Sequence, residues 1–308
     1  MDKNDRIFVG GHRGMVGSAI LRCLQKTGFN NLILRTSNEL DLTIQADVDH
    51  FFQTEKPEYV FLAAARVGGI LANSIYRADF IYDNLQIQNN VIHSAWKYEI
   101  KKLLFLSSSC VYPRNCPQPM KEEFLWSGHL EPTNEPYAVA KLAGMSMCRA
   151  YHDQYGSNFI SIIPTNLYGP NDNYDPQQSH VMASLIQKAH LAKLNGDKQF
   201  VVWGSGKPRR ELMYVDDASE AALLLMQEYS ESEPINVGSG KEYSIAELAE
   251  KAKSIIGFKG DLVFDSTKPD GAPRKLLDIS GIKTLGWKSS TLLGQGISSS
   301  YADYLLHH

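Results

Sequence analysis

Three glycines directly after the first apolar segment constrain the fold of this chain more than any other feature. Residues 7–9 form a short apolar run, glycines follow at Gly11, Gly14 and Gly17, and apolar residues then recur at helical spacing as far as Gly28. This is the order of strand, turn and helix. Glycine at such a turn lets the backbone approach a pyrophosphate at the helix N-terminus, where Cβ atoms would obstruct it. The motif therefore predicts a dinucleotide site, the alternative being a plain tight turn.

Two arginines beside this turn favour NADP(H) as the dinucleotide. The second apolar run, residues 32–34, ends at Arg35, where an NAD site would have an acidic side chain for the adenosine ribose hydroxyls. Arg13 lies within the glycine turn itself. Because a guanidinium group binds phosphate bidentately, we expect Arg13 and Arg35 to hold the 2′-phosphate of NADP. Two solvated surface arginines are the alternative.

Further apolar runs alternate with helical patterns through the first half of the chain. A long helix is expected from about residue 75 to 98, and the predicted strands cover residues 7–9, 32–34, 59–63, 103–106 and 159–163. Strands that alternate with helices pair in parallel through right-handed crossovers. We therefore predict an α/β fold with a doubly wound parallel Rossmann sheet, whose ligand lies at the carboxyl ends of the strands.

A serine, a tyrosine and a lysine are the candidate catalytic groups. Tyr137 and Lys141 are four residues apart and would share one helix face, to which Ser108 would be presented by a strand ending near Ser107. We expect the ammonium group to lower the pKa of Tyr137 toward the working range. The phenol could then exchange a proton with the oxygen of a carbonyl/alcohol pair while a hydride moves at carbon. An ordinary amphipathic helix pair is the alternative.

The second half of the chain alternates less regularly. A helix is expected to begin near His180, and Ser244 with Glu247 predicts a capping box at the start of another helix. Residues 204–211 read as a basic cluster on a glycine loop, suited to a diphosphate or else simply solvated. We predict an NADP-binding Rossmann domain at residues 1–165, completed by about 212–238, and a mainly substrate-binding, smaller mixed domain at 166–308.

The composition argues against several classes of partner. The formal net charge of −3 gives no basic field for nucleic acid. No apolar run approaches the roughly 20 residues that cross a bilayer, and the N-terminus is polar, so we expect a cytoplasmic protein without a membrane partner. The four cysteines have no metal-ligand spacing and are expected to be free thiols, with no metal site.

Taken together, the glycine motif and the order of Ser108, Tyr137 and Lys141 resemble the extended short-chain dehydrogenase/reductase family. The resemblance covers nearly the whole chain and is carried by residues 11–20, 108–113, 131–138, 164–170 and 268–271. It is strongest with the members that act on GDP-linked keto-sugars. It implies NADPH-dependent conversion of GDP-4-keto-6-deoxy-D-mannose to GDP-L-fucose, by epimerisation at C3 and C5 and then reduction at C4. It also implies a homodimer, through a bundle of the helix from about residue 75 and the helix that carries Tyr137. One departure is Ser107, where the family has glycine.

The resemblance also assigns roles to individual residues. Cys110 maps onto the base and His180 onto the acid of the epimerisation, while Ser108 and Tyr137 hold the enolate oxygen and Lys141 holds the nicotinamide ribose. The implied cofactor contacts are Gly11, Arg13, Gly14, Met15, Val16, Gly17, Arg35, Asp41, Leu42, Ala63, Ala64, Lys141, Pro164, Asn166, Leu167 and His180. The implied contacts with the GDP-linked substrate are Asn166, Val181, Lys188, Trp203, Arg210 and Lys275.

Three other functions stay open from the sequence. A sibling enzyme that forms GDP-colitose would use the same epimerising pair on a substrate lacking the C3 hydroxyl. A 4-epimerase or 4,6-dehydratase would retain NAD, and the dehydratase should carry an acidic pair where this chain has Ser109 and Cys110. An inactive NADP-binding sensor should have lost Tyr137 or Lys141, and both are present.

Overall fold

The structure, a computed structural model, describes residues 1–176, 178–268 and 270–308. Pro269, within the family-like segment 268–271, lies outside the described residues. No helix of the described part is long and apolar enough to cross a membrane.

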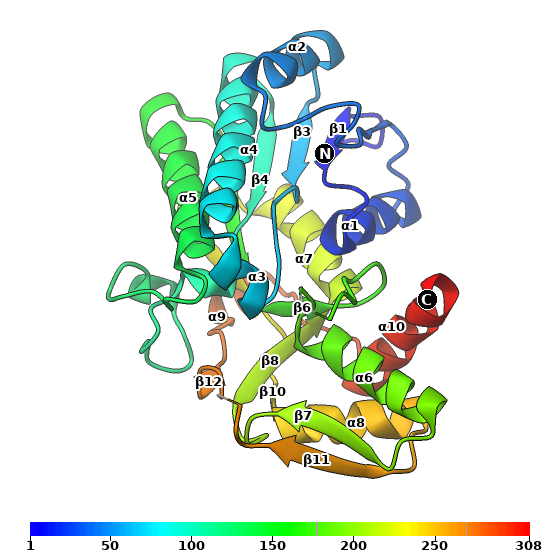
Figure 1. The fold of residues 1–308 in the computed structure, drawn as a ribbon. Coiled ribbons are helices and arrows are strands. Elements are labelled where there is room, and N and C mark those ends of the chain that lie inside the picture. The colour runs from blue at the N-terminus through cyan, green and yellow to red at the C-terminus, as the bar shows by residue number, and fades with distance from the viewer. Residues whose placement is uncertain (177, 269) are drawn as a thin grey trace.

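A six-stranded parallel sheet forms the centre of the first half, with strand order β2-β1-β3-β4-β5-β9. Its strands are β1 (Ile7–Gly10), β2 (Leu32–Ile33), β3 (Tyr59–Leu62), β4 (Lys102–Leu106), β5 (Phe159–Pro164) and β9 (Ile235–Val237). Helices α2 (Gln45–Glu55), α4 (Arg77–Lys97) and α5 (Glu135–Tyr155) pack side by side on one face, and α1 (Met15–Lys26) and α7 (Val215–Glu228) pack together on the other (Figure 1). The predicted doubly wound α/β fold is confirmed.

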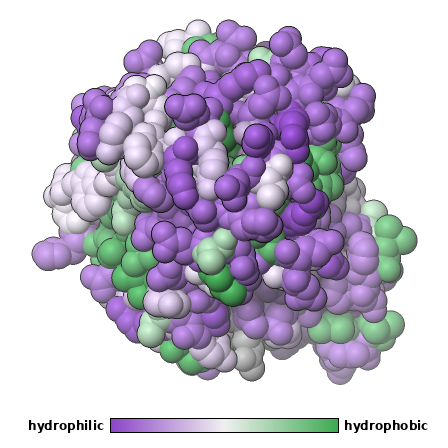
Figure 2. All heavy atoms as spheres, turned by 90° about the horizontal axis from the view of Figure 1, so that it is seen from above, coloured by the Kyte–Doolittle hydropathy of each residue, from purple (hydrophilic) through white to green (hydrophobic). Residues whose placement is uncertain are grey.

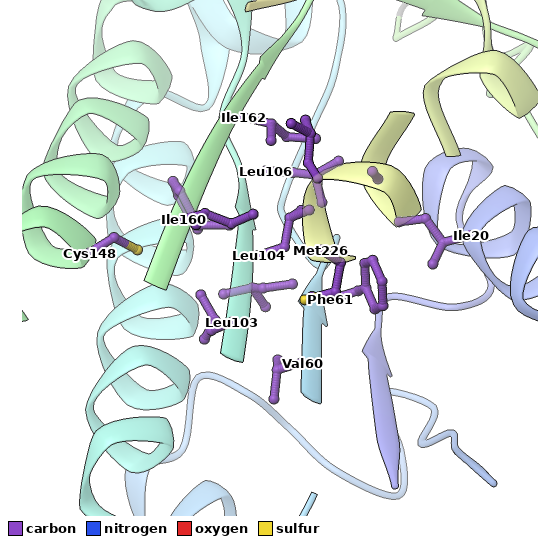
Figure 3. Packing of buried hydrophobic residues seen from close by; sticks show 14 of the residues in the cluster. Ile20, Val60, Phe61, Leu103, Leu104, Leu106, Cys148, Ile160, Ile162 and Met226 are labelled. Carbon is purple, nitrogen blue, oxygen red and sulfur yellow. The ribbon is translucent and has the colours of Figure 1, made fainter. Parts of the chain in front are cut away.

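Burial on both faces explains why the central strands are continuous apolar runs. All five residues of β4 and all six of β5 are buried. Figure 3 shows leucines of β4 and isoleucines of β5 packed between Cys148 of α5 and Met226 of α7. Because this core is closely packed, the chain leaves each strand at a fixed point, and those points share one edge of the sheet.

The second half of the chain builds smaller sheets around its own hydrophobic core. One has the order β10-β8-β12 with β6 also on β8, and the other pairs β11 with β7. The strands are β6 (Asn166–Tyr168), β7 (Gln199–Trp203), β8 (Arg209–Tyr214), β10 (Glu242–Ser244), β11 (Asp261–Asp265) and β12 (Arg274–Lys275), and the helices are α6 (Val181–Asn195), α8 (Ile245–Ile256) and α10 (Leu293–His307). The short helix α9 (Ser280–Thr284) packs instead against β9, and its Ile282 belongs to the core of the large sheet. Figure 1 shows β7, β8, β10, β11 and α8 gathered beyond the carboxyl edge of the large sheet.

Several local predictions are confirmed and one is wrong. Ser244 and Glu247 form the capping box of α8, and His180 is the N-cap of α6. The helix expected from about residue 75 is α4, preceded by the short helix α3 (Ile70–Ile75). The basic cluster predicted on a glycine loop is only partly on a loop: Lys207 lies in the loop of residues 204–208, whereas Arg209 and Arg210 begin strand β8, because their backbone groups pair with both β10 and β12.

The surface seen from the α2 end is mainly hydrophilic, with scattered hydrophobic side chains (Figure 2). A cavity of about 300 Å³ lies between α2 and α4, and a second of about 540 Å³ lies between α2, α4 and Met147 of α5; Gln45, Asn90 and His93 line both. They lie away from the strand ends and hold none of the predicted catalytic groups.

Candidate active site

The turn between β1 and α1 uses its three glycines in different ways. Gly11 has a φ of +81°, and a Cβ there would lie 2.7 Å from the amide nitrogen of Ala64. A Cβ at Gly17 would overlap the carbonyl oxygen of Gly11. Gly14 is different, since a Cβ would make only an ordinary 3.5 Å contact with that oxygen. The fold itself therefore requires Gly11 and Gly17, whereas the absence of a side chain at Gly14 is suited to an approaching ligand.

Gly14 is also the N-cap of α1, and no side chain caps the amides that open this helix. Such amides, together with the positive end of the helix dipole, form an anion site. Met15 and Val16 follow in the first turn of the helix, and Ala63 and Ala64 follow β3 beside Gly11. The residues present fit the diphosphate of a dinucleotide.

The two arginines predicted for the 2′-phosphate are in different situations. Arg13 is exposed on the turn. Arg35 is ion-paired with Glu55 of α2 and donates to the carbonyl of Leu34 at 2.8 Å. Arg6 pairs with the same carboxylate at 3.2 Å. Binding of a phosphate by Arg35 therefore requires that the guanidinium exchange Glu55 for the phosphate, or bind both.

Neighbouring residues hold Asp41 and Leu42 in place. The Asp41 carboxylate accepts from the backbone amide and the hydroxyl of Thr43, at 2.9 and 2.7 Å. The Asn90 side chain donates to the Leu42 carbonyl at 2.9 Å. Asp41 thus shapes its own turn, and α4 fixes the backbone that follows it.

Ser108, Cys110 and Tyr137 come together at the carboxyl end of β4. The chain turns there into a short 3₁₀ helix, Ser109–Val111, and the Ser108 hydroxyl accepts from the Cys110 amide at 3.3 Å. The same hydroxyl hydrogen-bonds the phenol of Tyr137, and Cys110 lies close enough for its charge to act on that phenol. Tyr137 is in the first turn of α5, whose second residue is Pro136.

The predicted effect of Lys141 on Tyr137 is wrong. Burial raises the pKa of Tyr137, charge on Cys110 raises it further, and only the hydrogen bond from Ser108 lowers it. Burial also lowers the pKa of Lys141 to about 7. Both charged forms lose hydration in this dry environment, and this cost exceeds the expected attraction between them. Tyr137 is consequently a protonated phenol at neutral pH.

Lys141 is held by the backbone of β4. Its ammonium donates to the carbonyl of Leu106 at 2.8 Å and lies 4.8 Å from the centre of the Phe105 ring. The side chain is only 3% exposed. Lys141 therefore occupies a fixed position one helical turn behind Tyr137.

His180 comes from the second half of the chain. It is accessible at the N-cap of α6, and desolvation by the surrounding protein lowers its pKa. The segment before it is tied to the first half, because the Gly69 amide donates to the Gln178 carbonyl at 2.7 Å. A Cβ at Gly69 would lie 2.8 Å from the Ser179 carbonyl oxygen.

Sequence reasoning missed the segment that makes this contact. Asn73 donates to the carbonyls of Gly68 and Gly69, at 2.7 and 3.0 Å, and so fixes their turn. Phe80 then packs edge-on against Tyr137, with ring centroids 6.3 Å apart. Paired glycines directly before a helical pattern were the available signal. The segment from Gly68 to Phe80 thus contacts both Tyr137, through Phe80, and the residues that precede His180, through Gly69.

Four of the six residues predicted to hold the substrate form two pairs. Arg210 of β8 and Lys275 of β12 are directly opposite in the parallel register. Arg210 donates to the Ala272 carbonyl at 2.5 Å. Lys188 lies 4.7 Å from the ring centre of Trp203, which is 62% exposed. Val181, the first residue of α6, follows His180 directly.

Asn166 lies where the chain passes from β5 to β6, between Pro164 and Leu167, and its side chain donates to the Glu211 carbonyl at 3.2 Å.

Asp270 is a further residue that sequence reasoning missed. Its carboxylate accepts from the amide and the hydroxyl of Ser205, at 2.8 and 2.7 Å, and so holds the glycine loop after β7. Among the described residues, no group of three or more His, Cys, Asp or Glu could hold a metal ion.

Comparison with known proteins agrees with this geometry. The family described as NAD dependent epimerase/dehydratase matches residues 7–238. Putative GDP-L-fucose synthase 2 of Arabidopsis thaliana is 58% identical over 305 residues, covering 99% of this chain and 93% of the relative. The GDP-L-fucose synthase of Escherichia coli is 48% identical over 309 residues, covering 97% and 96%.

Solved structures give the same result. A GDP-L-fucose synthetase from Naegleria fowleri bound to NADP has a TM-score of 0.92 at 30% identity, covering 99% of this chain and 95% of that one. A GDP-6-OMe-4-keto-L-xylo-heptose reductase from C. jejuni has a TM-score of 0.94 at 41% identity, covering 100% and 99%. The chain therefore belongs to the NAD dependent epimerase/dehydratase family, the extended short-chain dehydrogenases/reductases, and groups within it with the GDP-L-fucose synthases.

Proposed function

We propose that this protein converts GDP-4-keto-6-deoxy-D-mannose to GDP-L-fucose, by epimerisation at C3 and C5 followed by NADPH-dependent reduction at C4. The observation that carries the proposal is the position of Cys110, one short turn after Ser108 and beside the Tyr137 phenol. A thiol is thereby placed next to the two hydroxyls suited to a carbonyl oxygen. The names of relatives at 48–58% identity support the same reaction.

The epimerisation needs two acid–base groups. The C4 carbonyl acidifies the hydrogens on C3 and C5, and inversion removes a proton on one face and returns one on the other. Cys110 removes the proton and His180 returns it, since thiols and imidazoles as residue types ionise close enough to neutrality for acid–base catalysis. The lowered pKa of His180 disfavours its charged form, so a protonated His180 is a ready proton donor. Ser108 and Tyr137 donate hydrogen bonds to the enolate oxygen.

The reduction uses the same hydroxyls. NADPH, when bound, supplies the hydride that adds to C4. Tyr137 gives its proton to the C4 oxygen, a role that fits the raised pKa of its phenol. Lys141, fixed by Leu106, holds the nicotinamide ribose beside Tyr137. The amides that open α1 hold the cofactor diphosphate, with Arg13 and Arg35 toward the 2′-phosphate.

Residues of the second half bind the GDP part of the substrate. Arg210 and Lys275, opposite each other on two adjacent strands, hold the diphosphate. Lys188 and Trp203, which contact each other, are further substrate contacts. Residues 1–165, with α7 and β9, serve as the NADP-binding domain, and the remainder mainly binds substrate. A homodimer formed through α4 and α5 and a cytoplasmic location complete the proposal, the latter favoured by four free thiols.

One incubation tests the reaction. The protein is given GDP-4-keto-6-deoxy-D-mannose and NADPH in heavy water, NADPH absorbance is followed, and deuterium in the product is located by NMR. NADPH oxidation with deuterium at C3 and C5 is expected. Cys110→Ser should lose deuterium incorporation, whereas Cys23→Ser, which changes a thiol in α1 away from the site, should not. Full incorporation by Cys110→Ser would contradict the role of this thiol.

A second candidate is a C4 reductase of another GDP-linked keto-sugar. Solved structures described as GDP-heptose reductases are 41–42% identical to this chain, and a GDP-L-colitose synthase of Yersinia pseudotuberculosis is 35% identical. NADPH oxidation without deuterium incorporation would favour a simple reductase. Faster turnover of a substrate that lacks the C3 hydroxyl would favour the colitose reaction.

A further inference from the structure

Strand β8 contains a carboxylate that the proposed reaction does not use. Glu211 is completely buried, with an exposed fraction of 0%. Within the part of the chain that the structure describes, no lysine or arginine forms an ion pair with it. Its carboxylate is hydrogen-bonded by backbone amides: Gly240 donates to Oε1 at 2.7 Å and Leu277 donates to Oε2 at 2.8 Å.

Such an arrangement is costly and therefore needs a reason. Burial raises the pKa of Glu211, and the amide hydrogen bonds only partly oppose that shift. A buried carboxylate loses its hydration, and hydrogen bonds to amides recover part of that loss. An apolar residue at this position would avoid the cost of burying a carboxylate, but it would leave the amides of Gly240 and Leu277 without their acceptor.

The two amides come from the segments that flank the substrate-binding strands. Gly240 lies in the turn that joins β9 to β10, and Leu277 lies two residues beyond Lys275 of β12. The Glu211 carboxylate therefore ties both segments to β8. The fit is close, because a Cβ added at Gly238 would overlap Glu211 Oε1.

Adjacent residues of a strand face opposite sides, so the carboxylate of Glu211 and the guanidinium of Arg210 project to opposite faces of β8. Lys275 is the register partner of Arg210. The contact of Glu211 with Leu277 thus fixes β12, and with it Lys275, relative to Arg210. The backbone carbonyl of Glu211 also accepts from the Asn166 side chain at 3.2 Å.

We propose that Glu211 is a positioning residue, which sets the spacing of Arg210 and Lys275 for a nucleoside diphosphate by holding β12 and the 238–240 turn against β8. The inference rests on the proposed function, which assigns Arg210 and Lys275 to the diphosphate. On this proposal, the two amide hydrogen bonds on the buried face of β8 determine the affinity of its opposite face for the nucleoside diphosphate.

Glu211→Gln tests this directly. The glutamine has the same shape, but its NH₂ group cannot accept a hydrogen bond, so one of the two amides loses its acceptor. We expect the Kd for GDP and the KM for the GDP-linked substrate to rise by about tenfold, with kcat within about threefold of wild type. The Kd for NADPH should be unchanged, since the amides of α1 lie in the other half of the protein.

Glu122→Gln is the matched control. Glu122 is partly buried, whereas Glu211 is fully buried, but it likewise accepts from a backbone amide, that of Asn236 at 2.8 Å, and burial likewise raises its pKa. It does not contact β8 or β12 through any hydrogen bond that the described residues make. A fall in stability without a change in GDP affinity is expected of this variant. Equal weakening of GDP binding by both variants would overturn the proposal, as would an unchanged GDP affinity in folded Glu211→Gln.

Gly238→Ala keeps the test informative if Glu211→Gln does not fold. Its methyl group displaces Oε1 without removing the charge, and the backbone of Gly238 is outside the left-handed region, so no backbone strain is added. The same rise in the Kd for GDP is expected, and an unchanged Kd overturns the proposal.

Binding of GDP is measured by calorimetry and needs no turnover. It therefore distinguishes a failure of the proposed reaction from a failure of the inference about Glu211. If wild type binds GDP but does not turn over the keto-sugar, the proposed reaction fails while the role of Glu211 is still decided by the variants. If wild type does not bind GDP, the assignment of Arg210 and Lys275 to the diphosphate is wrong, and the inference about Glu211 is wrong as well.

Discussion

The Lys141 ammonium lies 5.9 Å from the centre of the Tyr137 ring, and its hydrogen bond goes to the Leu106 carbonyl. The two side chains share one helix face, yet burial moves both pKa values toward the neutral forms. The pair is thus prepared to donate a proton from the phenol. A negatively charged ligand beside Lys141 would stabilise the ammonium form.

The first prediction concerns the pH dependence of cofactor binding. The pKa of Lys141 is about 7 in this protein, and NADPH is an anion, so NADPH binds the charged form of Lys141 more tightly. Affinity is therefore expected to fall as the pH rises above about 7, and binding should be accompanied by proton uptake. Fluorescence titrations of NADPH from pH 6 to 9 measure the slope. Lys141→Met should weaken binding and flatten this slope, and an unchanged slope would contradict the assignment.

The second prediction separates reduction from epimerisation. Tyr137→Phe removes the proton donor for the C4 oxygen, and NADPH oxidation should fall by about 100- to 10,000-fold. Deuterium incorporation should fall less, because Ser108 still donates to the enolate oxygen. Normal NADPH oxidation by this variant would show that another group donates the proton. Tyr151→Phe, which changes a phenol elsewhere on α5, is the control.

The third prediction distinguishes the glycines of the first turn. Gly17→Ala forces a methyl group against the Gly11 carbonyl and should lower stability by about 4 kcal/mol or more. Gly14→Ala has room within the protein and should leave the melting temperature nearly unchanged. Its Cβ nevertheless lies where the diphosphate approaches, so the Kd for NADPH should rise by about tenfold or more. Thermal unfolding and NADPH titration measure the two effects, and tight NADPH binding by Gly14→Ala would place the diphosphate elsewhere.

The fourth prediction concerns the contact that supports His180. The methyl group of Gly69→Ala would press on the Ser179 carbonyl and shift the segment before His180. Deuterium incorporation should fall by about tenfold or more, since small displacements of a catalytic group are costly. NADPH oxidation with an already epimerised ketone should change little. Gly281→Ala, whose Cβ would make ordinary contacts with Ile235 at 3.5 Å and Glu122 at 3.9 Å, is the control, and equal loss of both activities in Gly69→Ala would refute the role in positioning.

Local sequence patterns were sufficient for much of this protein. The period of the apolar residues, the capping box at Ser244 and the four-residue spacing of Tyr137 and Lys141 depend on neighbours within one turn of chain. The parallel sheet follows from the alternation of such elements. For the same reason the convergence of Ser108 and Tyr137 could be anticipated, because both lie at the carboxyl edge of the sheet.

Other features were decided only by the tertiary structure, because they depend on burial and on partners distant in sequence. Leu277 donates to Glu211 across 66 residues, Glu55 pairs with Arg35 across 20, and neither contact has a local signal. The pKa of Tyr137 was predicted in the wrong direction because spacing indicates which charges are near but not how much water is lost. The sequence by itself thus determined the secondary-structure elements and their order. The tertiary structure decided which charged groups are buried away from water, which are ion-paired and which are accessible to a ligand.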